Sequence, residues 1–320
     1  MTDSVHNLLI KVRENEYKAL LDRDKTAEDV KQLRPWLLLI RDITDYGTNL
    51  IPRCIGSSDR KLEDAVLVAA LLRQVVAMLD GVEVLLSGGA VYAANLQMRA
   101  LFEASVYVDW MLAGDLEKKA QYYYVHNLRR LRTWARRAQP GSTEWEEFSS
   151  AVKDFGIKIE DHVKESAKGT LQEIDRVLSQ PKFAAVNDDF EACRKRRGRE
   201  PAWYVPLGIT SIGAMSRAVG RYSLYVMLYS GASDVMHTSN YGHHFQIGTG
   251  RLTLQPIRSL ERFETVLRFS NSLAIHTFQR ILEKYRPEER AAFARKYAEN
   301  WRHEFLNFPK IEYRPTHTEI

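Results

Sequence analysis

The sequence has only two cysteines and no long apolar run, and both scarcities narrow the class of protein. Cys54 and Cys193 stand alone without C-x-x-C spacing, so they support neither a disulfide framework nor a zinc knuckle and suit a reducing compartment. The longest apolar run, residues 65–72, is far shorter than the ~20 residues that a membrane-spanning helix needs. Residues 1–16 lack the basic and apolar regions of a signal peptide. We therefore expect a cytoplasmic protein with no membrane contact.

Strand signals, internal repeats and low-complexity segments are also scarce. Apolar residues instead recur at spacings of three and four along most of the chain, which is typical of amphipathic helices. The chain of 320 residues is long enough to bury a substantial core. We predict an all-α multi-helix bundle with a short irregular Gly- and His-rich loop after the central helix. One helical domain is expected over residues 1–308, followed by a frayed tail over 309–320, with L-T-L-Q at 252–255 as the only strand-like piece.

Capping signals predict where several helices begin and end. A helix is expected from about Arg60 to Leu86, because glycines follow it directly. Asp115 is the predicted N-cap of a long aromatic and basic helix. Thr170, with a glutamate three residues later, has the pattern of a capping box and predicts the start of a shorter helix.

The stretch over residues 219–245 holds the chain's most unusual polar residues and is the predicted central helix. Polar side chains recur there every four residues with apolar residues between them, which places them in a slanting band on one side of a helix. The band consists of Tyr225, Tyr229, Ser233 and His237. A helix that is apolar on nearly every side is buried, so these hydroxyl and imidazole groups need hydrogen-bond partners elsewhere in the chain.

A second band, in a helix predicted over residues 90–113, supplies such partners. Arg99, Glu103 and Tyr107 stand four residues apart among apolar neighbours. A guanidinium oriented by a carboxylate suits a phosphate; the alternative is a buried ion pair between Arg99 and Glu103 that only holds two helices together. We expect this helix to pack beside the central helix. If Glu103 is a buried partner of Arg99, its replacement by alanine should cost about 3–5 kcal/mol.

Ser233 and His237 on one helix suggest a comparison with the nucleophile and base of a hydrolase. Catalytic triads usually take their members from different elements, and no G-x-S-x-G motif is present. Ser233 is therefore expected to hydrogen-bond a carbonyl or His237, which leaves His237 as the candidate general acid or base.

His237, His243 and His244 also form a loose histidine cluster. With Glu103 or Asp109 they are able to ligate a metal ion, but no H-E-x-x-H motif supports this. The alternative is a His237 that hydrogen-bonds Glu103 or a tyrosine. We expect no metal and no cofactor.

In order and spacing, four of these motifs together resemble a bacterial all-helical family that is described only as a domain of unknown function. They are the R-x-x-x-E helix, the aromatic helix containing Tyr122-Tyr123-Tyr124, Trp203, and the Y-x-x-x-S-x-x-x-H helix. The resemblance covers about residues 65–245. It implies an all-helical fold and Arg99, Glu103, Ser233 and His237 as signature positions, without an established activity.

Some helical bacterial families of this general kind are compared with HEPN ribonucleases, toxins and defence effectors, which carry an R-x-x-x-x-H motif. This chain departs from that pattern, because no arginine lies four to six residues before any of its nine histidines. The departure argues against a HEPN mechanism.

Basic residues gather on one face of the helix after Asp115. Arg129, Arg132 and Arg136 recur at spacings of three and four with Trp134 near them, so this face is able to follow a phosphate backbone and stack a base. Residues 194–199, R-K-R-R-G-R, add a second positive patch. The alternative is a solvated face balanced by the acidic residues that follow it. The net charge of +5 is a mild excess that tolerates anionic partners without requiring them.

Two hypotheses from different classes follow. The first is an RNA- or nucleotide-directed effector of a toxin or phage-defence system, a ribonuclease or another hydrolase, with Arg99, Glu103, Ser233 and His237 as its site. The second is a non-catalytic helical interaction or sensor module whose polar cluster is structural.

A helix after Pro287 presents many aromatic residues at near-helical spacing, which predicts a homodimer or packing against the chain's own core. These aromatic residues are Phe293, Tyr297, Trp301, Phe305 and Phe308.

Overall fold

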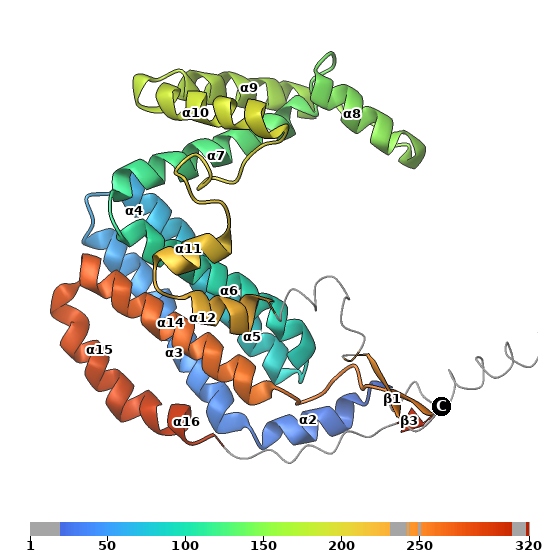
Figure 1. The fold of residues 1–320 in the computed structure, drawn as a ribbon, viewed down its shortest axis with the longest axis vertical. Helices are drawn as coiled ribbons and strands as arrows, with labels where there is room; N and C mark the ends of the chain where they lie inside the picture. Colours follow the sequence, from blue (N-terminus) through green and yellow to red (C-terminus); the bar gives the residue numbers. More distant parts are fainter. Residues whose placement is uncertain (1–19, 231–241, 243, 249–250, 309–317, 320) are drawn as a thin grey trace, which may run out of the picture. The chain divides into compact units, whose positions relative to one another are not determined.

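A computed structural model describes residues 20–230, 242, 244–248, 251–308 and 318–319 of the chain. Most of these residues are helical, so the predicted all-α fold is confirmed (Figure 1). The chain divides into two compact units, one formed by residues 1–110 with 216–320 and the other by residues 111–215. The single helical domain over residues 1–308 stays a prediction.

The first unit contains the long core helices and the C-terminal helices. Two helices, α6 and α11, include the sequence positions at which the units divide, after residues 110 and 215. Its elements are α2 (Arg23–Lys31), α3 (Arg34–Gly56), α4 (Leu62–Asp64), η1 (Ala65–Leu72), α5 (Arg73–Ser87), α6 (Val91–Leu112), α11 (Ile212–Ala218), α12 (Tyr222–Leu224), η3 (Tyr225–Ser230), α14 (Phe263–Tyr285), η5 (Pro287–Glu289), α15 (Arg290–Lys296), η6 (Tyr297–Trp301) and α16 (Arg302–Leu306). Three of these segments, η1, η3 and η6, are π-helical. Such segments are rare and occur often at functional sites.

The centre of the first unit is a three-way packing of α3, α5 and α14. Ile43 of α3, Leu79 of α5 and Phe278 of α14 are fully buried. The helices approach closely at Gly47, because a Cβ atom there would lie only 2.5 Å from the Phe278 ring. A larger residue at Gly47 would therefore separate α3 from α14.

The helix predicted from about Arg60 to Leu86 is the continuous stretch Leu62–Ser87, formed by α4, η1 and α5 and ended by Gly88. It begins with a hydrogen bond from the Lys61 backbone N–H to the Asp64 carboxylate, 3.0 Å. By length and composition this stretch could cross a membrane, and 50% of its most apolar window is buried inside the fold. Core helices meet the same criterion.

The aromatic residues of the C-terminal helices pack largely within the first unit. Phe293 and Trp301 are buried, and the Tyr46 ring of α3 lies 5.1 Å and 5.6 Å from their ring centroids. Phe308 contacts Trp36 in the same way, at 5.1 Å. Packing against the chain's own core was the alternative to a homodimer that the sequence left open. Self-association stays a prediction, but these aromatic residues are no longer its main support.

The second unit is built from α7 with α9 and α10 packed against it. Its elements are α7 (Leu116–Arg136), α8 (Thr143–Val152), η2 (Lys153–Phe155), α9 (Asp161–Leu178) and α10 (Pro181–Arg197). Asp115 caps α7 as predicted, accepting a 2.9 Å hydrogen bond from the Lys118 N–H. The start predicted at Thr170 is wrong, because Thr170 lies inside α9 and its hydroxyl donates to the Ser166 carbonyl. A threonine inside a helix can satisfy its hydroxyl in this way without ending the helix.

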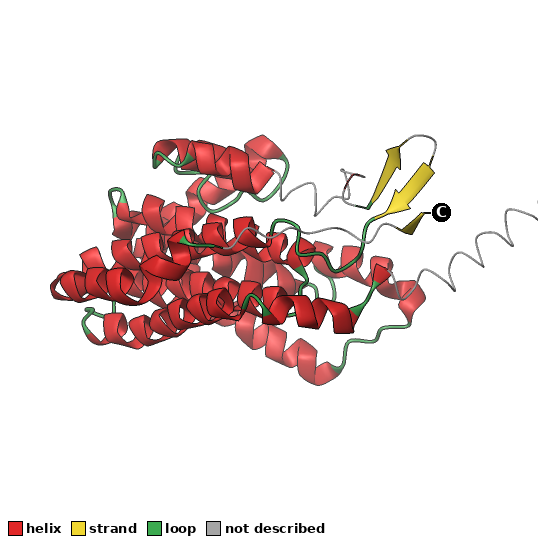
Figure 2. Ribbon diagram, turned by 90° about the horizontal axis from the view of Figure 1, so that it is seen from below, coloured by secondary structure: helices red, strands yellow, loops and turns green. Residues whose placement is uncertain are grey.

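Three short strands form the only sheet in the described residues (Figure 2). Strand β1 (Phe245–Gly248) pairs antiparallel with β2 (Arg251–Leu254), and β2 pairs with β3 (Thr318–Glu319). The strand-like L-T-L-Q therefore supplies most of β2, and part of the predicted irregular loop is a strand. Of the predicted frayed tail, 309–317 and 320 lie outside the described residues.

Candidate functional site

Arg99 of α6 and Tyr229 of η3 join the two helices that carry the polar bands. An Arg99 Nη atom donates a 2.6 Å hydrogen bond to the Tyr229 hydroxyl, and the guanidinium carbon lies 4.1 Å from the centroid of the Tyr229 ring. The Tyr229 hydroxyl in turn donates to Glu103 at 3.3 Å. The Tyr107 hydroxyl donates to the other Glu103 oxygen at 2.7 Å. The predicted packing of the Arg99 helix beside the central helix is therefore observed over the part that the structure describes.

The link between Arg99 and Glu103 differs from the predicted one, because it passes through the Tyr229 hydroxyl and not through a direct ion pair. Within the described residues, the Arg99 guanidinium forms a hydrogen bond and a cation–π contact with Tyr229, it forms no ion pair, and its buried Nε atom makes no hydrogen bond. Its positive charge thus has no carboxylate in contact with it there. Burial, followed by the negative charge of Glu103, raises the pKa of Tyr229 to about 12, although the charge of Arg99 lowers it. The phenol therefore stays protonated near neutral pH and keeps donating to Glu103.

This geometry changes the expected result of replacing Glu103 by alanine. The carboxylate is half-buried and accepts from two phenols, so the change removes two hydrogen bonds but strands no buried charge. We expect the free energy of unfolding to fall by about 1–2 kcal/mol, and not by 3–5 kcal/mol. Urea denaturation followed by circular dichroism measures it. Glu103→Gln, which keeps an acceptor, is the control and should lose less stability. A loss of about 3–5 kcal/mol in Glu103→Ala would contradict the link through Tyr229.

A row of stacked tyrosines holds Tyr229 in place. Tyr222, Tyr225 and Tyr229 follow one another with ring centroids 5.7 Å and 5.1 Å apart and planes 15° and 22° apart. Arg217 lies over the Tyr222 ring at 3.7 Å, so a guanidinium covers each end of the row. Cations over aromatic faces and offset stacking are both favourable. The row therefore fixes the orientation of the Tyr229 hydroxyl that Arg99 binds.

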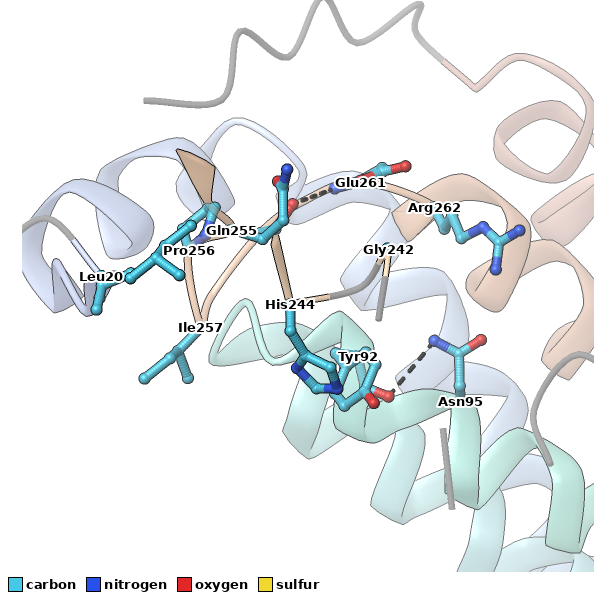
Figure 3. A pocket seen from close by; sticks show the side chains of 12 residues that line it. Leu20, Tyr92, Asn95, Gly242, His244, Gln255, Pro256, Ile257, Glu261 and Arg262 are labelled. Atoms are coloured by element: carbon cyan, nitrogen blue, oxygen red, sulfur yellow. Dashed lines mark hydrogen bonds between the residues drawn. The ribbon is translucent and has the colours of Figure 1, made fainter. Parts of the chain in front are cut away.

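A cavity of about 430 Å³ lies along the same helix, one turn before Arg99 (Figure 3). Asn95 of α6 lines it, and the His244 ring stands edge-on to Tyr92, with ring centroids 5.7 Å apart. Figure 3 shows His244 beside Tyr92 at one wall and Arg262 at another. The volume falls within the range of ligand pockets, about 300–1,000 Å³. Polar groups of α6 thus continue from this cavity to Arg99.

Three of the predicted residues lie outside the described residues: Ser233, His237 and His243. His244, the remaining member of the histidine cluster, lies at the cavity beside Tyr92 and not beside Glu103. Among the residues that the structure describes, no group of three His, Cys, Asp or Glu side chains is placed to hold a metal ion.

A second polar cluster in the first unit was not predicted as a cluster. Asp109 and Arg221 are both buried, and an Arg221 Nη atom lies 2.8 Å from an Asp109 oxygen and 2.7 Å from the Ser105 hydroxyl. The His276 Nε2 atom lies 2.9 Å from both Asp109 oxygens. The Thr277 hydroxyl, also buried, donates to Ser105 at 2.8 Å.

The sequence contains only one part of the signal for this cluster. Ser105 and Asp109 stand four residues apart in an apolar helix, like Arg99 and Glu103. Arg221 and His276 are 112 and 167 residues from Asp109 along the chain. No local spacing can connect residues so far apart, so only the packing of α14 and the start of α12 against α6 brings them together.

The predicted basic face of α7 is made of paired arginines. Arg129 is buried and forms two hydrogen bonds with Glu200, at 2.5 Å and 2.9 Å, and one with Glu191 at 2.9 Å. Arg132 pairs with Asp175. Since its charge is buried and matched, Arg129 does not belong to a surface that a polyanion reaches.

Arg136 and Trp134, which belong to the same face, are more exposed than Arg129. The Arg136 side chain is 38% exposed and pairs with Glu144, one of the acidic residues that follow the helix, while Trp134 is 59% exposed. A role in nucleic-acid binding stays a prediction for Arg132, Arg136 and Trp134.

Comparisons with known proteins yield one match. Residues 65–250 match the model of a family of unknown function (DUF5677), which covers more than half of the chain and nearly the same residues as the predicted signature region. No curated protein and no solved structure matches the chain.

Proposed function

The chain belongs to the DUF5677 family, whose function is unknown, and we propose that it is an RNA- or nucleotide-directed effector of a bacterial toxin or phage-defence system. In this proposal α6 supplies the anion-binding group and the adjoining cavity receives part of the ligand. The observation that carries it is the state of Arg99, a half-buried guanidinium that contacts a tyrosine and no carboxylate in the described part of the chain.

A guanidinium in this state is suited to bind an anion. Taking a charge out of water is unfavourable unless a charge of opposite sign contacts it. Glu103 does not contact the Arg99 guanidinium, because its oxygens accept hydrogen bonds from Tyr107 and Tyr229. A phosphate matches the fork of N–H donors that a guanidinium presents. Hydrogen bonding and stacking by Tyr229 hold the guanidinium in one orientation, which reduces the ordering cost of binding.

The neighbouring cavity suits the remainder of a nucleotide. Tyr92 and His244 supply aromatic rings and Asn95 supplies an amide on its wall, the types of group that stack on a base and bond its edges. His237, which the sequence predicts as a general acid or base, supplies the proton transfer for hydrolysis in this proposal.

Direct RNA binding and cleavage by the full chain test the proposal. We expect Arg99→Gln to weaken the binding of single-stranded RNA about tenfold or more, since it removes a charge-assisted contact. His237→Ala should leave binding intact and abolish cleavage. Fluorescence anisotropy of a labelled RNA measures affinity, and gel electrophoresis across several divalent metals measures cleavage. Arg73→Gln, at an exposed arginine of α5, is the matched control and should behave like the wild type.

The salt dependence of the affinity for RNA tests the α7 face separately. Because Arg129 is buried, at most Arg132 and Arg136 of the three arginines contact phosphates. Replacing both by alanine should therefore reduce the slope of log affinity against log salt by about 1.4, at roughly 0.7 for each contact. A wild-type protein that neither binds nor cuts RNA would refute the proposal and favour the non-catalytic interaction or sensor module.

A further inference from the structure

A second cavity, of about 600 Å³, lies in the first unit between α14 and the segment from α15 to α16. It is separate from the cavity beside Tyr92, and the proposed RNA or nucleotide site does not use it. Its walls are mainly apolar and aromatic: Ile275, Leu282, Ala291, Phe293, Ala294, Tyr297 and Phe305. The π-helical segment η6 begins at Tyr297 of this wall. A mainly apolar cavity of this volume is typical of a site for one small molecule.

Polar side chains from two helices also line this cavity. Ser272, His276 and Gln279 of α14 line it at spacings of four and three, so they stand on one face of that helix. Arg290 lines it from the start of α15. A few polar groups at the edge of an apolar cavity fix the orientation of a ligand.

The His276 ring is held in place by groups behind it. Its Nε2 atom is engaged by Asp109, at 2.9 Å from both oxygens, while 43% of its side chain stays exposed. The exposed part of this ring is among the groups that line the cavity. A histidine fixed in this way by a carboxylate is oriented before any ligand arrives.

The charges joined to this edge are unequal. Asp109 is paired with Arg221 at 2.8 Å and lies 3.6 Å from Arg280. Glu283 is paired with Arg280 at 2.5 Å and with Arg290 at 3.5 Å. Of all these charged groups only Arg290 lines the cavity, and no carboxylate is among the described residues that line it. This positive charge favours a ligand of negative charge.

We propose that the α14–α15 cavity binds a small organic anion with an apolar or aromatic body, such as an aromatic carboxylate. The body would lie against Phe293, Tyr297 and Phe305, and the anionic group at the edge formed by His276 and Arg290. The apolar walls account for the affinity of the body, and the unequal charges account for the preference for an anion over a neutral molecule.

The probe for this site is 8-anilinonaphthalene-1-sulfonate, an aromatic anion that fluoresces in apolar surroundings, titrated into the full chain. Its control ligand is N-phenyl-1-naphthylamine, which has the same rings without the sulfonate. Ala294→Trp is designed to fill the cavity, and Arg290→Gln removes the cation at its edge. Arg295→Gln is the matched control, because Arg295 is exposed on the same helix and does not line the cavity. Circular dichroism establishes that each variant is folded.

We expect saturable binding of one sulfonate per chain, lost in Ala294→Trp, weakened about tenfold in Arg290→Gln and unchanged in Arg295→Gln. The neutral ligand should bind about tenfold more weakly than the sulfonate. Wild-type affinity in Ala294→Trp would place the dye elsewhere and overturn the proposal. Equal binding of both ligands, with no effect of Arg290→Gln, would refute the preference for an anion. A dimer by light scattering that Ala294→Trp dissociates would show that a second copy fills the cavity.

Discussion

Replacing Asp109 by alanine is expected to lower the free energy of unfolding by about 3–5 kcal/mol near neutral pH. Asp109 and Arg221 are both more than nine-tenths buried, at 7% and 8% exposure. Without the carboxylate, the Arg221 guanidinium stays buried next to the neutral hydroxyl of Ser105, and a buried charge without a counter-charge is strongly unfavourable. His276 loses its partner as well.

The same variant should show a defined pH dependence. Burial raises the pKa of Asp109, but hydrogen bonds and charges from His276 and Arg221 lower it by more, so this pKa lies below its ordinary value. A lowered pKa in the folded state stabilises the fold above the unfolded pKa of about 4, and this stability is lost as the pH falls through the folded value. The stability difference between wild type and Asp109→Ala should therefore shrink below about pH 4.

Urea denaturation at several pH values measures both effects. Asp80→Ala, at an exposed carboxylate of α5, is the control and should change stability by no more than about 0.5 kcal/mol. A pH-independent difference, or one as small as that of the control, would contradict a buried and ionised Asp109.

Replacing Arg129 by alanine should destabilise the second unit by about 3 kcal/mol. The side chain is only 6% exposed, and its donors bond Glu191 and Glu200 of the same unit, with a further 2.7 Å hydrogen bond to Asn187. The change leaves two carboxylates close together without their shared cation. Because each keeps about a third of its surface in water, the loss should be near the lower end for a broken buried pair.

Thermal and urea denaturation of Arg129→Ala, compared with Arg130→Ala, measure this loss. Arg130 is adjacent and exposed, so its replacement should be nearly neutral. Indistinguishable stabilities would contradict the buried role of Arg129. A buried and paired Arg129 also differs from the sequence-based prediction, which placed it on a basic face able to follow a phosphate backbone.

Local sequence patterns were sufficient for the fold class and for the packing of the Arg99 helix beside the helix of Tyr229. Apolar spacing predicts the helices because a helix repeats every 3.6 residues, and a cap such as Asp115 acts within three residues of itself. The sequence predicted that the two polar bands would need hydrogen-bond partners on burial, and Arg99 does bond Tyr229. The prediction that the central helix is buried on nearly every side is wrong for its described part, because Val226 and Met227 are 51% and 62% exposed.

Only the tertiary structure decided which polar group pairs with which. Glu103 accepts from two tyrosines and not from Arg99, because the Tyr229 hydroxyl lies between them. Arg129 has the same helical spacing as the more exposed Arg136, but α10 and the segment after it bring carboxylates to Arg129 alone. Burial and ion pairing depend on what the rest of the chain places against a side chain, and no spacing within one helix contains that information.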